Sequence, residues 1–247
     1  MRGKKGIAVA DFLVEQLNNI GTSIAAVAAL GTAAYGLVDV TKAFAGGISN
    51  AGFSDVKKAL APFDAALSSL GNAPYQTLRA NWLNGVAKAD QKAAAKALIR
   101  LGLTPANASA LAKAVGIDAA ALKAAATKAD KGTALSADDI NILGRFDALV
   151  SAILDAGYER GDQKYRTAAK CLACIVAICL SVAAGAMFYH AQMTAANSGV
   201  SVSGYLNSKD FVISLIVGAI ATPLAPIAKD ISTSLAAAVN ALGSVRR

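Results

Sequence analysis

The chain has 247 residues, of which 55% are hydrophobic, 16% charged and 6% aromatic, and its mean hydropathy is +0.47. Ordinary soluble domains carry about 25% charged residues, so this composition excludes a typical soluble domain along the whole chain and indicates a membrane protein with a more polar portion. The net charge of +8 suits anionic lipid headgroups, nucleic acid or a solvated basic surface equally well.

The N-terminal segment, 1–47, contains the weakest of three candidate membrane segments. Gly21 to Val38 is uncharged but consists largely of Ala, Gly and Thr, with little Leu or Ile to favour insertion. Ile7 to Leu17 precedes it, contains two acidic residues and is expected to form an amphipathic lead-in. A signal peptide with a cleavage site at Ala43-Phe44-Ala45 is the alternative. We favour a retained membrane helix, because acidic residues are atypical of a signal peptide.

The charged residues concentrate in 52–161, where turn and cap signals predict a soluble helical bundle. Thr104-Pro105 is expected to be an N-cap followed by proline at the first helical position, and Ser136 with Asp139 resembles a capping box. No stretch alternates convincingly enough for a strand, so the expected fold is all-α. Helices are expected over Ser54–Leu70, Gln76–Gly85, Ala89–Leu101, Thr104–Gly116, Asp118–Gly132, and from Ser136 past Gly157 and Gly161 toward the next apolar run.

The strongest membrane signal is Ala168 to Phe188, which reads AAKCLACIVAICLSVAAGAMF and contains a single charge, Lys170. About 20 apolar residues span a bilayer core, and a lysine near a helix end can reach the headgroups. The sequence therefore predicts a transmembrane helix over 167–190. A short polar connection, 191–208, follows it.

The second arm of this predicted hairpin is 209–228, whose uncharged part reads FVISLIVGAIATPLAPIA. Pro223 and Pro226 each remove a backbone donor and are expected to kink the helix. The residues after it, 229–247, place apolar side chains at helical spacing and predict an amphipathic helix that lies on the membrane or packs on a neighbour. These apolar positions are Ile231, Leu235, Ala238, Val239 and Leu242.

Small residues punctuate all three apolar segments, and we expect Gly31, Gly36, Gly185 and Gly218 to be helix-packing positions. Apolar burial does not drive helices together in lipid, so close backbone approach across small residues does the packing. Three helices offer few partners within one chain, which predicts a homo-oligomer in the lipid bilayer.

Basic residues predict the orientation. Arg160, Lys164, Arg166 and Lys170 crowd the start of the second membrane segment and are expected to contact anionic lipid, whereas 191–208 contains no Lys or Arg at all. The positive-inside rule places the connection outside and the helical domain and the C-terminus in the cytoplasm. If the first segment also crosses, the basic N-terminus lies outside, against the same rule. That segment therefore either enters without crossing or inserts late, behind the hairpin.

The sequence contains few candidates for chemistry. Cys171, Cys174 and Cys179 lie in one apolar run, and His190, the one histidine, lies about 30 Å along a helix from Cys171. We therefore expect no metal site, and no cofactor or catalytic motif is recognised. The spacing of Ala112 and Gly116 resembles a helix-turn-helix, but an ordinary helical hairpin is the favoured interpretation.

The favoured function is a self-associating, non-enzymatic membrane protein, either a pore or channel subunit or a structural component of a membrane assembly. A pore predicts a polar stripe, whereas a structural component predicts hydroxyls that bond to their own helices. The alternative is a membrane-tethered binding module whose basic helical domain holds nucleic acid or a protein partner. The candidate hydroxyls are Thr22, Ser23, Thr32, Ser181, Ser214 and Thr222.

Overall fold

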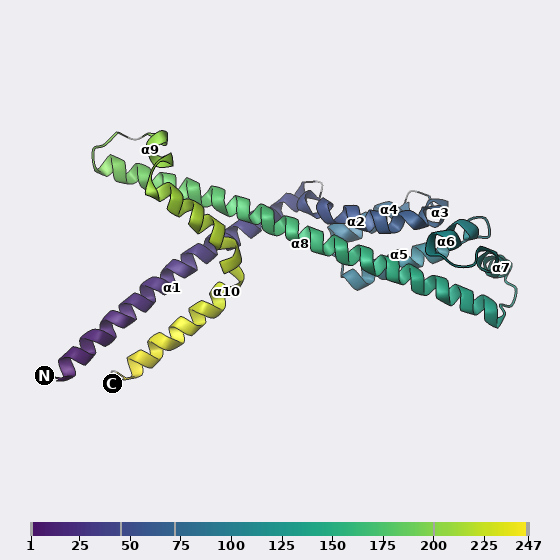
Figure 1. The fold of residues 1–247 in the computed structure, drawn as a ribbon, viewed down its shortest axis with the longest axis horizontal. Coiled ribbons are helices and arrows are strands. Elements are labelled where there is room, and N and C mark those ends of the chain that lie inside the picture. The colour runs from purple at the N-terminus through teal and green to yellow at the C-terminus, as the bar shows by residue number, and fades with distance from the viewer. Residues whose placement is uncertain (1, 45, 72, 200, 246–247) are drawn as a thin grey trace. The chain divides into compact units, whose positions relative to one another are not determined.

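The computed structural model describes the backbone of residues 2–44, 46–71, 73–199 and 201–245, and their side chains except those of 2–14, 229, 232–233, 236 and 239–245. This part of the chain is all-helical, with 86% helix and no strand (Figure 1). Its elements are α1 Arg2–Val40, η1 Thr41–Ala43, η2 Gly47–Ser49, α2 Asn50–Leu60, η3 Ala61–Phe63, α3 Asp64–Ser69, α4 Ala73–Leu83, α5 Lys88–Leu101, α6 Ala108–Val115, α7 Ala119–Asp130, α8 Ala137–Ala195, α9 Val202–Leu206 and α10 Lys209–Val245.

The chain divides into two compact units. Unit 1 combines Met1–Thr41 with Ala169–Arg247, and unit 2 is Lys42–Ala168. The fold therefore brings the two ends of the sequence together in one unit. The helix α8 contributes residues to both units.

Unit 2 is a helical bundle around one core. Along α8, Phe146, Val150, Leu154 and Tyr158 recur every four residues and are at most 1% exposed. This spacing places them on one helix face, where they pack with buried side chains of the surrounding short helices. Each fully buried side chain of this kind contributes about 1.5–3 kcal/mol. The other large members of the core are Val56, Leu60, Phe63, Leu67, Leu78, Ile99, Leu111 and Leu122.

Local cap signals fix several ends of the helices in unit 2. The Ser136 backbone N–H and hydroxyl both donate to Asp139, and the Asp139 N–H donates back to the Ser136 hydroxyl, which is the predicted capping box at the start of α8. Asp118 accepts from Ala120 and Ala121 as the N-cap of α7. The expectation for Thr104-Pro105 is wrong. The helix α6 begins at Ala108, because Asn107 accepts from the Thr104 N–H and the intervening residues form a turn.

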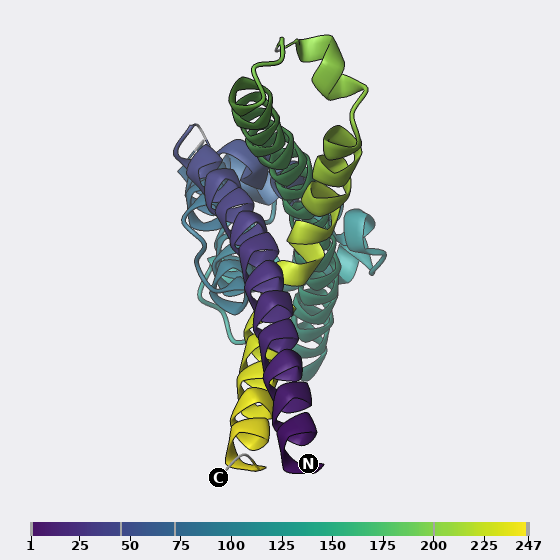
Figure 2. The same ribbon diagram turned by 90° about the vertical axis from the view of Figure 1, so that its left-hand side faces the viewer.

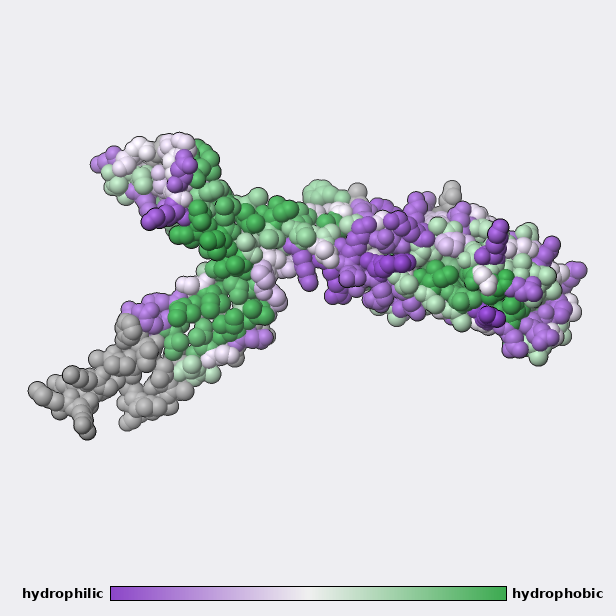
Figure 3. All heavy atoms as spheres, in the orientation of Figure 1, coloured by the Kyte–Doolittle hydropathy of each residue, from purple (hydrophilic) through white to green (hydrophobic). Residues whose placement is uncertain are grey.

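Within the described residues, three helices of the chain are long and apolar enough to cross a membrane, namely Glu15–Ala43, Ala137–Ala195 and Lys209–Ala228. In unit 1, α1 and α10 run alongside each other in both ribbon views (Figures 1 and 2). They are antiparallel, since Gly21 lies near Leu235 and Gly31 lies against Ala221. Hydrophobic residues gather on the visible face of this unit, whereas the visible face of unit 2 is mostly hydrophilic (Figure 3).

Three fully buried alanines mark the place where the helices of unit 1 meet. Ala34 comes from α1, Ala177 from α8 and Ala221 from α10, and all three are 0% exposed. A methyl group is small enough for three backbones to converge at one level. The side chains of Val27, Leu30 and Val176 pack around this contact.

Several boundaries differ from the sequence expectations. The N-terminal lead-in and the first membrane segment form the single helix α1. The polar connection contains a short helix, α9, whose N-cap Ser201 accepts from the Gly204 N–H. The helix α10 does not end near Ala228 but continues to Val245, so 229–247 does not begin a separate helix. Of the apolar positions expected there, Val239 and Leu242 are among the residues whose side chains the structure does not describe. The same holds for the basic residues at the N-terminus.

Two glycines of α8 provide a matched test of the packing in unit 2. A Cβ at Gly157 would overlap the Cβ of Ala59 in α2, whereas a Cβ at Gly144 meets nothing within 4 Å. We expect Gly157→Ala to lower the free energy of unfolding by about 1–3 kcal/mol through overpacking. Gly144→Ala should raise it by up to about 1 kcal/mol through helix propensity. Trp82, the one tryptophan of the chain, reports denaturant unfolding of unit 2 by its fluorescence. Equal effects of the two substitutions would contradict the packing.

Candidate functional site

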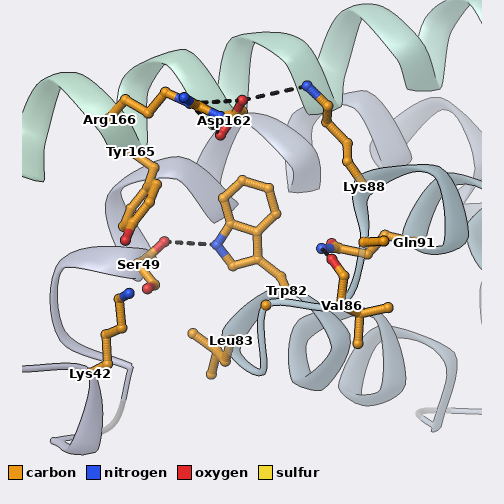
Figure 4. Close-up of a pocket in the computed structure, with 12 residues that line it drawn as sticks. Lys42, Ser49, Trp82, Leu83, Val86, Lys88, Gln91, Asp162, Tyr165 and Arg166 are labelled. Atoms are coloured by element: carbon orange, nitrogen blue, oxygen red, sulfur yellow. Dashed lines mark hydrogen bonds and ion pairs between the residues drawn. The ribbon is translucent and has the colours of Figure 1, made fainter. Parts of the chain in front are cut away.

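A cavity of about 320 Å³ opens in unit 2 where α4, α5 and α8 meet the short helices η1 and η2 (Figure 4). Its lining combines charged and aromatic side chains. The helix α8 contributes Asp162, Tyr165 and Arg166, and the start of α5 contributes Lys88 and Gln91. The other lining residues are Lys42, Ser49, Trp82, Leu83, Gly85, Val86 and Ala87.

Trp82 forms one wall of this cavity and is fixed in place. Its indole N–H donates to the Ser49 carbonyl at 2.9 Å. Its ring packs against Phe53 and Tyr158, with centroids 6.4 and 6.3 Å away. A Cβ at Gly52 would come within 2.6 Å of the Trp82 ring, so α2 approaches this closely only because residue 52 is glycine.

The charged side chains of the cavity form a small network. Lys88 donates to Glu159 at 2.8 Å and to Asp162 at 3.4 Å, and the hydrogen bond with Glu159 is the main reason that the pKa of Lys88 is raised. Arg166 donates from its Nε to both carboxylate oxygens of Asp162, at 3.0 and 3.1 Å. The Lys42 ammonium lies over the Tyr165 ring, 5.5 Å from its centroid. Lys88 and Arg166 thus share Asp162, and Lys88 also pairs with Glu159.

Gln91 carries the one polar atom of this cavity lining that is buried without a partner among the described residues. Its side-chain nitrogen donates to the Val86 carbonyl at 2.6 Å, which fixes the amide orientation. The Oε1 atom accepts no hydrogen bond, although the residue is only 5% exposed. An unpaired buried acceptor costs about 1–3 kcal/mol. In Figure 4 the Gln91 amide faces the cavity.

The four basic residues expected at anionic lipid have different surroundings. Arg166 lines the cavity, and Arg160 and Lys170 are exposed. Lys164 pairs with Asp55 at 3.1 Å and donates to the Ser54 hydroxyl at 3.0 Å. The hydrogen bond that Lys164 donates to the Asp55 carboxylate is the main reason that the pKa of Asp55 is lowered. The structure thus ties Lys164 to α2.

Three of the four glycines expected at helix contacts lie where a side chain would collide with a neighbouring helix. A Cβ at Gly31 would overlap the Ala221 carbonyl oxygen, and one at Gly218 would lie 2.5 Å from the Cα of Ile178. A Cβ at Gly185 would overlap the Ser214 hydroxyl. Gly36, by contrast, is exposed, and a Cβ there meets nothing within 4 Å.

Pro223 and Pro226 lie inside α10, and the ribbon of α10 changes direction part-way along its length (Figures 1 and 2). Each proline removes a backbone donor from the helix ladder. Both are exposed, whereas Ala221 and Thr222 just before them are buried.

The spans contain hydroxyl groups that bond to their own helices. Thr22 and Ser23 donate to the carbonyls of Asn18 and Asn19, each at 2.9 Å. Thr32 donates to Ala28 at 3.0 Å, and Ser214 donates to Asp210 at 2.8 Å. Of the remaining candidates, Ser181 is 6% exposed, and the Thr222 hydroxyl is buried without a partner among the described residues.

Tyr205 in α9 was not singled out by the sequence, although the structure gives it a central place in the hairpin. The one proton of its hydroxyl is shared between the Val182 carbonyl at 3.0 Å and the Ser214 hydroxyl at 3.2 Å. Its ring packs against Tyr189 and Phe211, with both centroids 5.6 Å away. Trp82 and Gln91 were missed in the same way. The available signal was weak, namely the single tryptophan of the chain and a lone tyrosine within a polar connection.

The cysteines do not form a metal centre within the described residues, where no group of three or more His, Cys, Asp or Glu is placed to hold an ion. All three are free thiols, with Cys171 and Cys179 exposed. The helices α6 and α7 pack against each other across Gly116, whose φ of 75° ends α6.

No family model matches the chain, and neither a curated protein nor a solved structure shows significant similarity to it.

Substitutions of Gly31 and Gly36 test the helix contact in unit 1, because both lie in α1 and only Gly31 approaches α10. Gly31→Ala should lower the thermal midpoint in detergent by roughly 5 °C, through overlap with Ala221. Gly36→Ala should leave the midpoint unchanged or slightly raised. The loss of helical circular dichroism on heating measures both midpoints. An unchanged midpoint for Gly31→Ala would rule out this arrangement.

Proposed function

We propose that this chain is a non-enzymatic, self-associating membrane protein that serves as a structural component of a membrane assembly. The observation that carries the proposal is the outer face of α1. Every exposed residue from Gly21 to Gly36 is Ala, Gly, Ser or Thr, namely Thr22, Ser23, Ala25, Ala26, Ala29, Thr32, Ala33 and Gly36.

The outer face of α10 differs from that of α1 between Gly21 and Gly36, although α1 exposes Ile20, Leu37 and Val40 beyond this stretch. The exposed side chains of α10 include Val212, Ile213, Ile216 and Ile220, which are large aliphatic groups suited to lipid chains. Small residues instead let the backbone of a second helix come close. Because the opposite face of α1 already packs against α8 and α10 through Ala34, the second helix in this proposal belongs to another copy.

The hydroxyl groups favour a structural component over a pore. A water-filled channel needs polar groups directed along its axis. Thr22, Ser23, Thr32 and Ser214 instead donate to carbonyls four residues earlier in their own helices. Such bonds satisfy the hydroxyl proton within the span, so these residues are compatible with a dry interface between helices.

The orientation is part of the proposal. The basic residues before the second span and the lack of Lys and Arg throughout 191–208 support a cytoplasmic position for unit 2 and the C-terminus. With three crossing helices, the N-terminus lies on the other side. The low hydropathy of the first span, 1.6 against 2.5 and 2.2 for the others, supports its late insertion behind the hairpin.

A membrane-tethered binding module is the second candidate function, and one observation favours it. The cavity of unit 2 combines three cations, two aromatic rings and the unpaired Gln91 acceptor. A ligand-binding role of unit 2 is compatible with self-association of the membrane helices.

The mass of the particle in nanodiscs wide enough for several copies tests self-association. We expect the wild-type protein to give a discrete multiple of its 24.8 kDa chain mass. Ala33→Leu should shift the particle toward one chain per disc, because the larger side chain separates the α1 helices. Ala219→Leu adds the same volume to the exposed face of α10 and should leave the mass unchanged.

A monomeric wild-type particle would overturn the proposal, and equal masses for the two variants would remove α1 as the interface. Liposomes that contain the assembled protein should show no ion flux above that of empty liposomes. A steady conductance from a discrete oligomer would instead support the pore.

A further inference from the structure

Unit 2 also has an apolar groove of about 530 Å³, between the end of α7 and the start of α8. Its lining is mostly apolar and includes Leu103 from the turn after α5, Ala129 of α7, and Ile140 and Leu143 of α8. Gly144 belongs to the same lining, and a Cβ there meets nothing within 4 Å. The groove therefore has room for a side chain above Gly144.

Two large aliphatic side chains of this region are exposed. Ile140 lines the groove and is 59% exposed. Leu101 is 71% exposed and lies in the chain between two lining residues, Arg100 and Leu103. Leu101 and Ile140 are the exposed large aliphatic residues of unit 2 among those that the structure describes. Apolar side chains that gather on a polar surface mark sites of contact between proteins. An exposed Leu101 beside an apolar groove gives one surface both halves of such a contact.

The charged residues at the groove complement one another. Asp130 lines the groove, is exposed, and has no ion pair among the described residues. The Arg100 side chain is 66% exposed, and its Nε lies 3.7 Å from Asp147, whose other oxygen pairs with Lys96 at 2.6 Å. No hydrogen bond among the described residues holds the Arg100 guanidinium, so it can pair with a further carboxylate. A surface with a cation beside its exposed leucine and an anion in its groove fits a copy of itself.

We propose that the apolar groove binds Leu101 of a second copy of this chain, with Arg100 of that copy against Asp130. In a two-fold symmetric interface each contact occurs twice, because both copies present the same surface. The inference rests on the proposed self-association and adds a contact between two copies of unit 2. Copies that α1 already holds together meet at a high effective concentration, so a contact of limited area adds to the assembly.

Disulfide formation between two variants of the full chain tests this contact. Both variants carry alanine in place of Cys171, Cys174 and Cys179, and they bear tags of different mass. One adds Leu101→Cys and the other Gly144→Cys. Mixed in nanodiscs wide enough for several copies, they should form the mixed dimer about tenfold or more faster than Leu101→Cys does with Ala152→Cys, because a disulfide needs Cβ atoms about 4 Å apart. Ala152 is exposed on α8 outside the groove.

Charge reversal tests the ion pair of the same contact. Arg100→Glu in both variants places like charges together and should lower the cross-linking rate about fivefold or more. Adding Asp130→Lys restores opposite charges and should recover most of the rate. Arg160→Glu reverses an exposed arginine outside the groove and should change the rate less than about twofold. Helical circular dichroism on heating checks that each variant is folded.

Equal rates for the Gly144→Cys and Ala152→Cys mixtures, in a particle of several copies, would overturn the groove contact and leave the α1 interface in place. A rate that Arg100→Glu does not lower, or that Asp130→Lys does not recover in a folded variant, would overturn the pairing of Arg100 with Asp130. One chain per disc would overturn the proposed self-association as well.

Discussion

The close contact of Ala34, Ala177 and Ala221 is the constraint on which unit 1 depends. In a bilayer, where we propose that these helices lie, apolar burial gives no advantage to helix association, so the helices would gain from backbone approach and close packing. Gly31 and Gly218 flank this contact and leave no room for a side chain. Helices that meet through methyl groups and backbone can lie closer than helices separated by Leu or Ile. The apolar residues of larger size therefore remain on the outer surface, as on α10.

The helix α8 uses two different packing chemistries along one continuous run. Its first half presents Phe146, Val150, Leu154 and Tyr158 to the core of unit 2, where burial of large side chains from water stabilises the bundle. Its second half presents Ala173 and Ala177, both 0% exposed, to the helices of unit 1. The change from large to small buried residues follows the change of solvent expected along the helix, from water to lipid.

The cavity lies in the part of the sequence where this change occurs. Asp162, Tyr165 and Arg166 follow the core stripe of α8 and precede its apolar run. Charged groups so near an apolar segment need partners of opposite charge. Asp162 is such a partner for both Lys88 and Arg166. Lys88 also pairs with Glu159, so the charged groups at this point of the chain are held in one network.

The sequence by itself determined the features that depend on neighbours along the chain. The all-helical class, the apolar runs, the cap of α7 at Asp118, the capping box at Ser136 and the continuity of α8 past Gly157 all follow from local hydrogen bonding and hydropathy. Only the tertiary structure decided which residues from distant segments meet. It placed α1 against α10, with Gly31 in that contact and Gly36 outside it. It also brought Lys42, Trp82, Gln91 and Arg166 to one cavity. These contacts depend on helix rotation and on the path of the turns, which composition and periodicity do not encode.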